Sequence, residues 1–105
     1  MNGCHFLGKL TCDPVLKKSH ESLFVNFTLE VEEYRRDKNG VKRRRIDLLN
    51  FEAWDSAAKT IQERAQKDDL MIIDAIARNE YTEEPETVVF RITNFKIIPK
   101  RDLDR

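Results

Sequence analysis

Residues 24–54, FVNFTLEVEEYRRDKNGVKRRRIDLLNFEAW, carry the clearest structural pattern in the chain. From Phe24 to Val31 apolar and polar side chains alternate, which is typical of a strand with one buried face. Asn39-Gly40 follows, and this dipeptide is a strong hairpin signal because both residues tolerate a positive φ. The stretch therefore predicts a long β-hairpin.

The two phases of this hairpin assign its residues to two faces, because successive side chains of a strand point to opposite sides. The core phase holds Val25, Phe27, Leu29 and Val31, then Leu49, Phe51 and Ala53. The outer phase holds Asn26, Thr28, Glu30 and Glu32, then Ile46, Leu48, Asn50, Glu52 and Trp54. The two faces are expected to have different roles.

Three further strands are predicted, one before the hairpin and two near the C-terminus. Residues 4–10 form a short apolar run that is followed by an Asp-Pro turn pair. Residues 70–76 and 87–98 are apolar and compatible with β-structure. The apolar phase of the last run slips near Thr93 and Asn94, which predicts a bulge of the kind that closing a small barrel requires.

A single helix is predicted between the hairpin and the last two strands. Asp55 or Ser56 is its expected N-cap, and apolar residues recur at helical spacing as far as Lys67. The sequence therefore predicts an all-β protein, a five-stranded OB-fold barrel with one helix between strands 3 and 4 and a long basic hairpin. All 105 residues are expected to form this single domain.

Composition argues against several classes of protein. The chain is 40% hydrophobic and 36% charged, and no apolar run approaches the roughly 18 residues that cross a bilayer. Its N-terminus lacks the pattern of a secretion signal, and Cys4 and Cys12 fit a reducing compartment as free thiols. We expect a cytoplasmic protein that is not associated with a membrane.

No catalytic or metal site is predicted. Cys4, His5, Cys12 and His20 lack the close Cys-x-x-Cys pairing of most zinc sites. The sequence shows no phosphate-binding loop and no clear acid–base pair. We therefore expect a protein that is not an enzyme and needs no cofactor.

The charges of the chain are unevenly distributed, although 19 basic and 19 acidic residues give a net charge of zero. Between Tyr34 and Arg45 the local net charge is +6, because one acid, Asp37, stands against seven basic residues. These are Arg35, Arg36, Lys38, Lys42, Arg43, Arg44 and Arg45. A projecting hairpin with this charge can follow a phosphate backbone, or it can simply protect a sheet edge.

Aromatic side chains favour the first of these interpretations. Tyr34 lies on the outer phase at the root of the basic hairpin, and Trp54 lies on the outer phase of the returning strand, with Leu48 between them. An exposed tryptophan beside a basic arm is a platform on which bases stack. The alternative is that Trp54 covers the helix that follows it.

Four motifs resemble those of bacterial-type single-stranded-DNA-binding proteins. They are GKLTCDPVL at 8–16, VNFTL at 25–29, Ala53-Trp54 before the helix, and KDDL at 67–70. Their order and spacing match the family over nearly the whole chain. The resemblance implies an OB-fold that assembles as a homotetramer, or as a dimer, and binds single-stranded DNA in replication, recombination and repair. It also implies that the protein is associated with the nucleoid.

The resemblance also assigns roles to individual residues. Tyr34 and Trp54 fall where the family places stacking aromatics, and Leu48 falls where it often has a third. Tyr81 is close to a fourth such position but one residue early unless a gap is allowed. The hairpin cations are expected to hold phosphates, with Lys9, Lys17 and Lys18 as lesser candidates.

The chain departs from the family in three places. Glu52 lies on the expected DNA face, where its carboxylate would repel phosphate. Asp68 replaces a glycine, and Asp is tolerated in the left-handed region. The family's acidic C-terminal tip, which docks replication and repair proteins, is absent, so a truncated chain or a tail-less phage, plasmid or organelle member is expected.

Two alternatives remain from the sequence. One is a replication-restart protein of the primosomal replication protein B type, a dimeric OB-fold that also binds single strands. The other is an OB-fold scaffold for protein interaction, in which the basic hairpin binds an acidic partner and Trp54 anchors the interface. Oligonucleotide binding distinguishes the scaffold from the other two.

Overall fold

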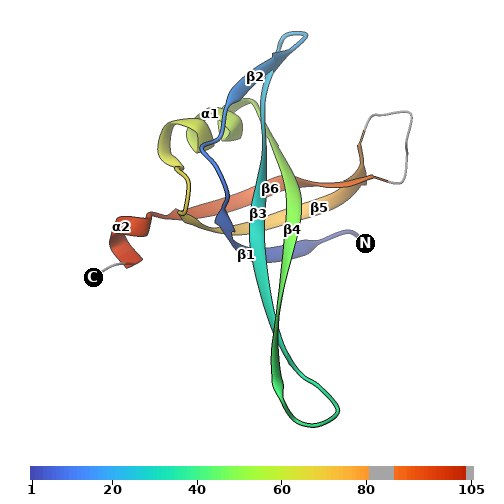
Figure 1. The fold of residues 1–105 in the computed structure, drawn as a ribbon. Coiled ribbons are helices and arrows are strands. Elements are labelled where there is room, and N and C mark those ends of the chain that lie inside the picture. Colours follow the sequence, from blue (N-terminus) through green and yellow to red (C-terminus); the bar gives the residue numbers. More distant parts are fainter. Residues whose placement is uncertain (81–86, 104–105) are drawn as a thin grey trace.

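The computed structural model describes residues 1–80 and 87–103. Its elements are, in order, β1 (Cys4–Leu10), β2 (Leu16–Ser19), β3 (Ser22–Arg36), β4 (Lys42–Trp54), α1 (Asp55–Arg64), β5 (Leu70–Asn79), β6 (Val88–Ile98) and α2 (Lys100–Leu103). The strands form one sheet of order β1-β5-β6-β4-β3-β2, and β1 also pairs with β3. Five strands thus make a closed ring, as predicted, and the β3–β4 hairpin projects far from it (Figure 1).

β1 closes the ring where it passes β3 at Gly8. A Cβ atom at Gly8 would lie 2.9 Å from the backbone oxygen of Glu30 and 2.9 Å from the Cβ of Leu29. Only glycine lets the two strands approach this closely. The next two residues of β1 then pair with β3, as Lys9 with Glu30 and Leu10 with Leu29.

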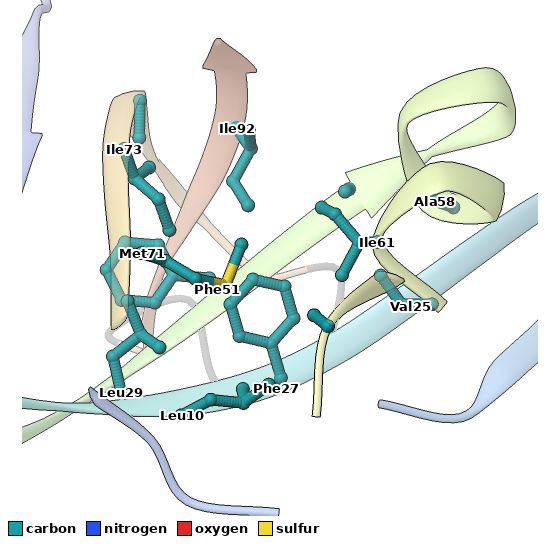
Figure 2. Packing of buried hydrophobic residues seen from close by; sticks show 13 residues of the cluster. Leu10, Val25, Phe27, Leu29, Phe51, Ala58, Ile61, Met71, Ile73 and Ile92 are labelled. Atoms are coloured by element: carbon teal, nitrogen blue, oxygen red, sulfur yellow. The ribbon is translucent and has the colours of Figure 1, made fainter. Parts of the chain in front are cut away.

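The core fills the inside of the ring and confirms the predicted core phase of the hairpin. Phe27 is 4% exposed, and Leu29 and Phe51 are fully buried. Figure 2 shows Met71 of β5 packed near Phe51, with Ile61 of α1 facing the same cluster. Because α1 contacts both β3 and β4, burying Ile61 fixes the helix against the ring.

The predicted slip in the last strand is a β-bulge. Asp74 pairs with Asn94, whereas the next residue, Ala75, pairs with Ile92. Thr93 is therefore the extra residue of β6. A bulge bends its strand and increases the local twist, and both effects help to close the ring.

The helix differs from the prediction at both ends. Its N-cap is Trp54, with no side-chain cap hydrogen bond, because the Asp55 carboxylate accepts a hydrogen bond from the backbone N–H of Leu23 at 3.2 Å instead. It ends at Arg64 rather than Lys67. The Asp69 carboxylate accepts a hydrogen bond from the backbone N–H of Gln66 at 2.9 Å. This hydrogen bond stabilises a non-helical backbone after Arg64.

Two short elements were not predicted. The first is β2, which pairs with β3 through a tight turn in which His20 has a φ of 55°. The second is α2, at whose start the Asp69 carboxylate accepts the backbone N–H of Lys100.

The left-handed backbone expected at Asp68 is confirmed by its φ of 75°. Within the described residues, no helix is long and apolar enough to span a membrane.

Candidate nucleic-acid interface

The β3–β4 ladder gives the hairpin one continuous face outside the core, which we call the outer ribbon face. Its cross-strand pairs run from Arg36–Lys42 and Tyr34–Arg44 near the tip to Phe24–Trp54 at the far end. Between these ends lie Glu32–Ile46, Glu30–Leu48, Thr28–Asn50 and Asn26–Glu52. The outer phase predicted from the sequence is thus confirmed as one face.

Tyr34 is the most prominent aromatic side chain of this face. It is 54% exposed, and its hydroxyl donates a hydrogen bond to Glu32 Oε2 at 3.2 Å. The Lys42 ammonium lies 4.6 Å from the ring centroid. The hydroxyl of the ring is therefore anchored, the Lys42 ammonium lies over one face of the ring, and the side chain is open to solvent.

The tip of the hairpin is ordered by Asp37. One carboxylate oxygen accepts the backbone N–H groups of Asn39 at 2.9 Å and Val41 at 3.0 Å, and the other accepts Arg43 Nε at 3.1 Å. Only Gly40 takes a positive φ in this turn, 78°. The turn thus holds the basic residues on two rigid, paired strands.

The positive charge of the hairpin is smaller than the local count suggests. Arg43, Arg44 and Arg45 pair with Asp37, Glu32 and Asp47 respectively. Over residues 32–47, where Glu32, Glu33 and Asp47 add to Asp37, the net charge falls to +3. Among the described residues no ion pair reaches the other four cations, which are Arg35, Arg36, Lys38 and Lys42.

The ion pairs and turn hydrogen bonds shift the pKa values of three hairpin groups. The backbone N–H of Val41, with those of Asn39 and the Arg43 side chain, lowers the pKa of Asp37. The hydrogen bond between the Arg44 and Glu32 side chains lowers the pKa of Glu32 and raises the pKa of Arg44. Both carboxylates therefore stay charged at neutral pH and fix their partners.

The expectation that Trp54 is an exposed side chain beside the basic arm is wrong. Trp54 is half-buried and stacks on Phe24, with ring centroids 5.1 Å apart and an interplanar angle of 30°. Tyr34 lies ten residues along β3 from Phe24, which is about 33 Å of extended strand. A single strand would have to follow the ribbon for this distance to reach both aromatics.

Exposed apolar side chains occupy the ribbon between the two aromatics. Leu48 is 63% exposed and Ile46 is 43% exposed. Beside them, Lys9 of β1 pairs with Glu30 at 3.5 Å, so its ammonium is partly neutralised. The sequence placed Ile46 on this face but did not single it out as a contact.

The carboxylate of Glu52 is not directed at solvent, contrary to the expectation that it repels phosphate. Its side chain is 6% exposed and accepts hydrogen bonds from the Arg78 guanidinium of β5. Arg91 of β6 pairs in register with Glu52; it is exposed and makes no ion pair with the described residues. This part of the face is therefore cationic, a feature that the sequence analysis missed.

Two more residues complete the account of the predicted site. Lys17 pairs in register with Phe24 and is exposed, so a cation lies beside the Phe24–Trp54 stack. Tyr81 lies outside the described residues. Most of the predicted residues thus lie along one face, with Tyr34, Arg36 and Lys42 at one end and Trp54 at the other. Arg35 pairs with Arg43 on the opposite face of the hairpin.

Residues 1–98 match the model of the single-strand binding protein family. The chain belongs to this family. No curated protein matches it significantly. Among solved structures, its fold is similar to that of other single-strand binding proteins.

Three of these structures show how far the similarity extends. Two are of the single-stranded DNA binding protein from Thermus aquaticus, a deletion mutant with a TM-score of 0.84 at 15% identity and the wild type with 0.81 at 16%. Both matches cover 96% of this chain and 52% of theirs, so this chain spans about half their length. The SSB domain of a Synechococcus sp. protein has a TM-score of 0.66 at 14% identity, covering 90% of this chain and 93% of that domain.

Proposed function

We propose that this chain binds single-stranded DNA along the outer ribbon face, with little sequence preference, during replication, recombination and repair. Membership of the single-strand binding protein family supports the ligand, and the similar Thermus aquaticus proteins are described as single-stranded DNA binding proteins. The observation that carries the proposal is the exposed Tyr34 ring on one face with Arg36 and Lys42, two of the four hairpin cations that have no ion-pair partner in the described part of the chain.

Binding combines two physical contributions. Bases stack on the Tyr34 ring and pack on Ile46 and Leu48, and stacking on an aromatic ring tolerates any base because every base has a π-face. The phosphates meet these four hairpin cations and Arg91, which releases counterions and makes the affinity fall with salt. A duplex hides its base faces, so it can use only the second contribution.

The path of the strand follows the ribbon. It starts at the hairpin tip, passes Leu48, and ends at Trp54, where Lys17 supplies a phosphate contact. Because Trp54 is stacked on Phe24, it offers a base the open part of its ring. The ribbon is long enough for several nucleotides, in keeping with the 4 to 16 or so that OB-folds cover.

The test is a fluorescence anisotropy titration of a labelled oligo-dT with the folded protein, with unlabelled single-stranded and duplex DNA as competitors. The proposal predicts saturable binding that the single strand displaces and the duplex displaces poorly. Trp54→Ala and charge reversal of Arg36 and Lys38 should both weaken binding, and only the charge reversal should reduce the salt dependence. No binding by the folded protein would favour the protein-interaction scaffold.

We also propose that the protein works as a homo-oligomer, a tetramer by resemblance to its family. An exposed apolar pair supports this, since Leu7 of β1 is 54% exposed and pairs in register with Ile72 of β5, which is 44% exposed. A second copy would bury this patch. Light scattering should give a multiple of the 12.4 kDa chain mass, and Leu7→Glu should reduce it. A monomer at all concentrations contradicts this part.

A further inference from the structure

One edge of β6 has no strand beside it after the bulge. β6 pairs with β5 along its length, but it pairs with β4 only at Phe90 and Arg91. Beyond these two residues, no strand of the described chain pairs with the second edge of β6. The backbone N–H of Phe95 instead donates a hydrogen bond to the side chain of Asn94 at 3.0 Å, a local bond of the kind that replaces a sheet hydrogen bond. We call residues 93–98 the free edge of β6.

A hollow of about 630 Å³ lies between this free edge and the C-terminal part of α1. Phe95 and Ile97 of β6 line one side of it, and Thr60 and Arg64 of α1 line the other. The helix leaves the hollow open because it packs mainly on β2, β3 and β4. Neighbouring strands of a sheet lie about 4.8 Å apart, so a peptide strand beside the free edge would lie in this hollow.

Exposed cations surround the hollow. Arg64 and Arg101 line it, and together with Lys67 and Lys100 they also line an adjoining hollow of about 420 Å³. Arg101 lies 4.0 Å from the Asp102 carboxylate, and no ion pair within the described residues engages the other three. We call these four basic residues the α2 cation cluster.

Two acidic residues that line the hollows offset this charge only in part. Asp69 is 5% exposed, and its two carboxylate oxygens accept the backbone N–H groups of Gln66 and Lys100, each at 2.9 Å. Asp69 is therefore occupied within the chain. Glu63 is exposed on α1, so the surface around the free edge keeps a net positive charge.

The surroundings favour a peptide over a nucleic acid. A peptide adds to a free strand edge through main-chain hydrogen bonds, whereas a nucleic acid has no backbone N–H groups to pair with β6. Phe95 lines the hollow but packs against the core, unlike Tyr34, which is open to solvent. Figure 1 shows that α2 leaves the ring away from the tip of the basic hairpin. Carboxylates on the peptide would complement the α2 cation cluster.

We propose that the free edge of β6 and the α2 cation cluster form a docking site for an extended acidic segment of a partner protein. The segment adds a strand to β6 and displaces the Asn94 side chain from the Phe95 N–H. Ile97 provides the next hydrogen bonds, because alternate residues of a strand direct their backbone groups to the same edge. The carboxylates of the segment pair with the α2 cation cluster. This second surface is independent of the proposed DNA binding.

The test follows the backbone amides of the isotope-labelled full chain by NMR while a synthetic octapeptide of alternating Glu and Thr is added. The amides of Phe95 and Ile97 should shift and saturate by millimolar peptide. An octapeptide of alternating Gln and Thr has no carboxylate side chains and should bind at least about fivefold more weakly, since each exposed ion pair contributes up to about 1 kcal/mol.

Two variants with equal loss of charge locate the binding site. Arg64→Gln combined with Lys100→Gln should weaken binding of the Glu peptide about three- to tenfold, the range for two exposed ion pairs. Arg36→Gln combined with Lys38→Gln, in the basic hairpin, is the matched control and should stay within about twofold of wild type. Equal weakening in the two double variants would overturn the inference, because the peptide would then respond to net charge alone.

The contribution of the strand edge is tested on the peptide, which avoids any effect on folding. Two versions of the Glu peptide carry N-methyl groups on alternate residues, one version in each phase. The version whose methyl groups face β6 should bind at least about fivefold more weakly, because it loses main-chain hydrogen bonds of about 0.5 to 1.5 kcal/mol each. Unchanged affinity in both versions would overturn strand addition.

Two further results would overturn the proposal. One is the absence of shifts at Phe95 and Ile97 with millimolar Glu peptide. The other is displacement of the peptide by unlabelled oligo-dT together with shifts of the same two amides, which would assign this surface to the DNA. The affinity of the wild type for oligo-dT tests the proposed function separately, so failure of either proposal leaves the other standing.

Discussion

Arg78 of β5 reaches across β6 to donate hydrogen bonds to both carboxylate oxygens of Glu52 on β4. The pair is largely buried, with the two side chains 21% and 6% exposed. It ties together strands that are not neighbours in the sheet. It also removes a negative charge from the face that we propose binds DNA.

Arg78→Met should therefore destabilise the fold, because it leaves the Glu52 carboxylate buried without its partner. Breaking such a pair from one side costs about 3 kcal/mol or more. Urea unfolding followed by circular dichroism measures the change. Arg91→Met, which alters an exposed arginine next to the same carboxylate, should stay within about 0.5 kcal/mol of wild type; equal losses in the two variants would contradict this account of the pair.

Gly8→Ala should destabilise the ring at its closure. The added methyl group would meet the backbone oxygen of Glu30 at 2.9 Å, and backbone cannot move aside as a side chain can. Overpacking of this kind costs about 1 to 3 kcal/mol, measured by thermal or urea unfolding. Gly3→Ala is the control, since a Cβ there meets nothing within 4 Å. Equal stability of the two variants would mean that β1 does not need glycine to cross β3.

The sequence predicted the ring well because its signals were local. The alternation at residues 25–31 and the Asn-Gly turn defined the ribbon, and the phase slip at Thr93 located the bulge. β2 escaped prediction because four residues with two lysines give too short a pattern. The Asp55 carboxylate engages Leu23, which is distant in sequence, so the helix cap was assigned wrongly.

The candidate site was predicted in its residues but not in its spacing. The outer phase correctly grouped Tyr34, Leu48 and Trp54, yet phase alone says nothing about distance along a strand. The Glu52–Arg78 pair depends on the order β5-β6-β4, which no local pattern encodes. Arg91 could have been noticed as the polar residue between Phe90 and Ile92 on the outer phase of a strand.

Tyr34→Ala should weaken binding of single-stranded DNA by about 1 to 3 kcal/mol, the range for loss of one stacking platform. Tyr34→Phe keeps the ring and loses only the hydrogen bond to Glu32, so it should bind nearly as well as wild type. Anisotropy titrations with oligo-dT compare the three proteins. Equal affinity of the alanine and phenylalanine variants would remove the ring from the interface.

The hairpin cations should set the salt dependence of binding. Replacing Arg36 and Lys38 by glutamine should reduce the slope of log affinity against log salt by about 0.7 for each phosphate that the variant no longer neutralises. Lys59 and Lys96 are exposed cations outside the hairpin, so glutamine at both is a control of equal charge change. If both double variants change the slope alike, the effect comes from net charge and not from the hairpin.

The hairpin tip should keep its structure as pH falls until the Asp37 and Glu32 carboxylates become protonated, and then lose it. The pKa of Asp37 is lowered from its ordinary 3.8 and that of Glu32 from 4.5. A lowered carboxyl pKa stabilises the folded form above the ordinary value, and this contribution is lost as pH falls through the lowered one. NMR shifts of the Asn39 and Val41 amides should therefore move below pH 3.8, and Asp37→Ala should abolish the transition. A midpoint above 3.8 would contradict the assignment.

The most direct test of the central claim is the affinity of the folded wild-type protein for labelled oligo-dT and for a duplex of equal length, measured by anisotropy at low and moderate salt. The account predicts saturable binding of the single strand that weakens with salt, and much weaker binding of the duplex. Equal affinity for both nucleic acids, or no binding of either, would contradict it.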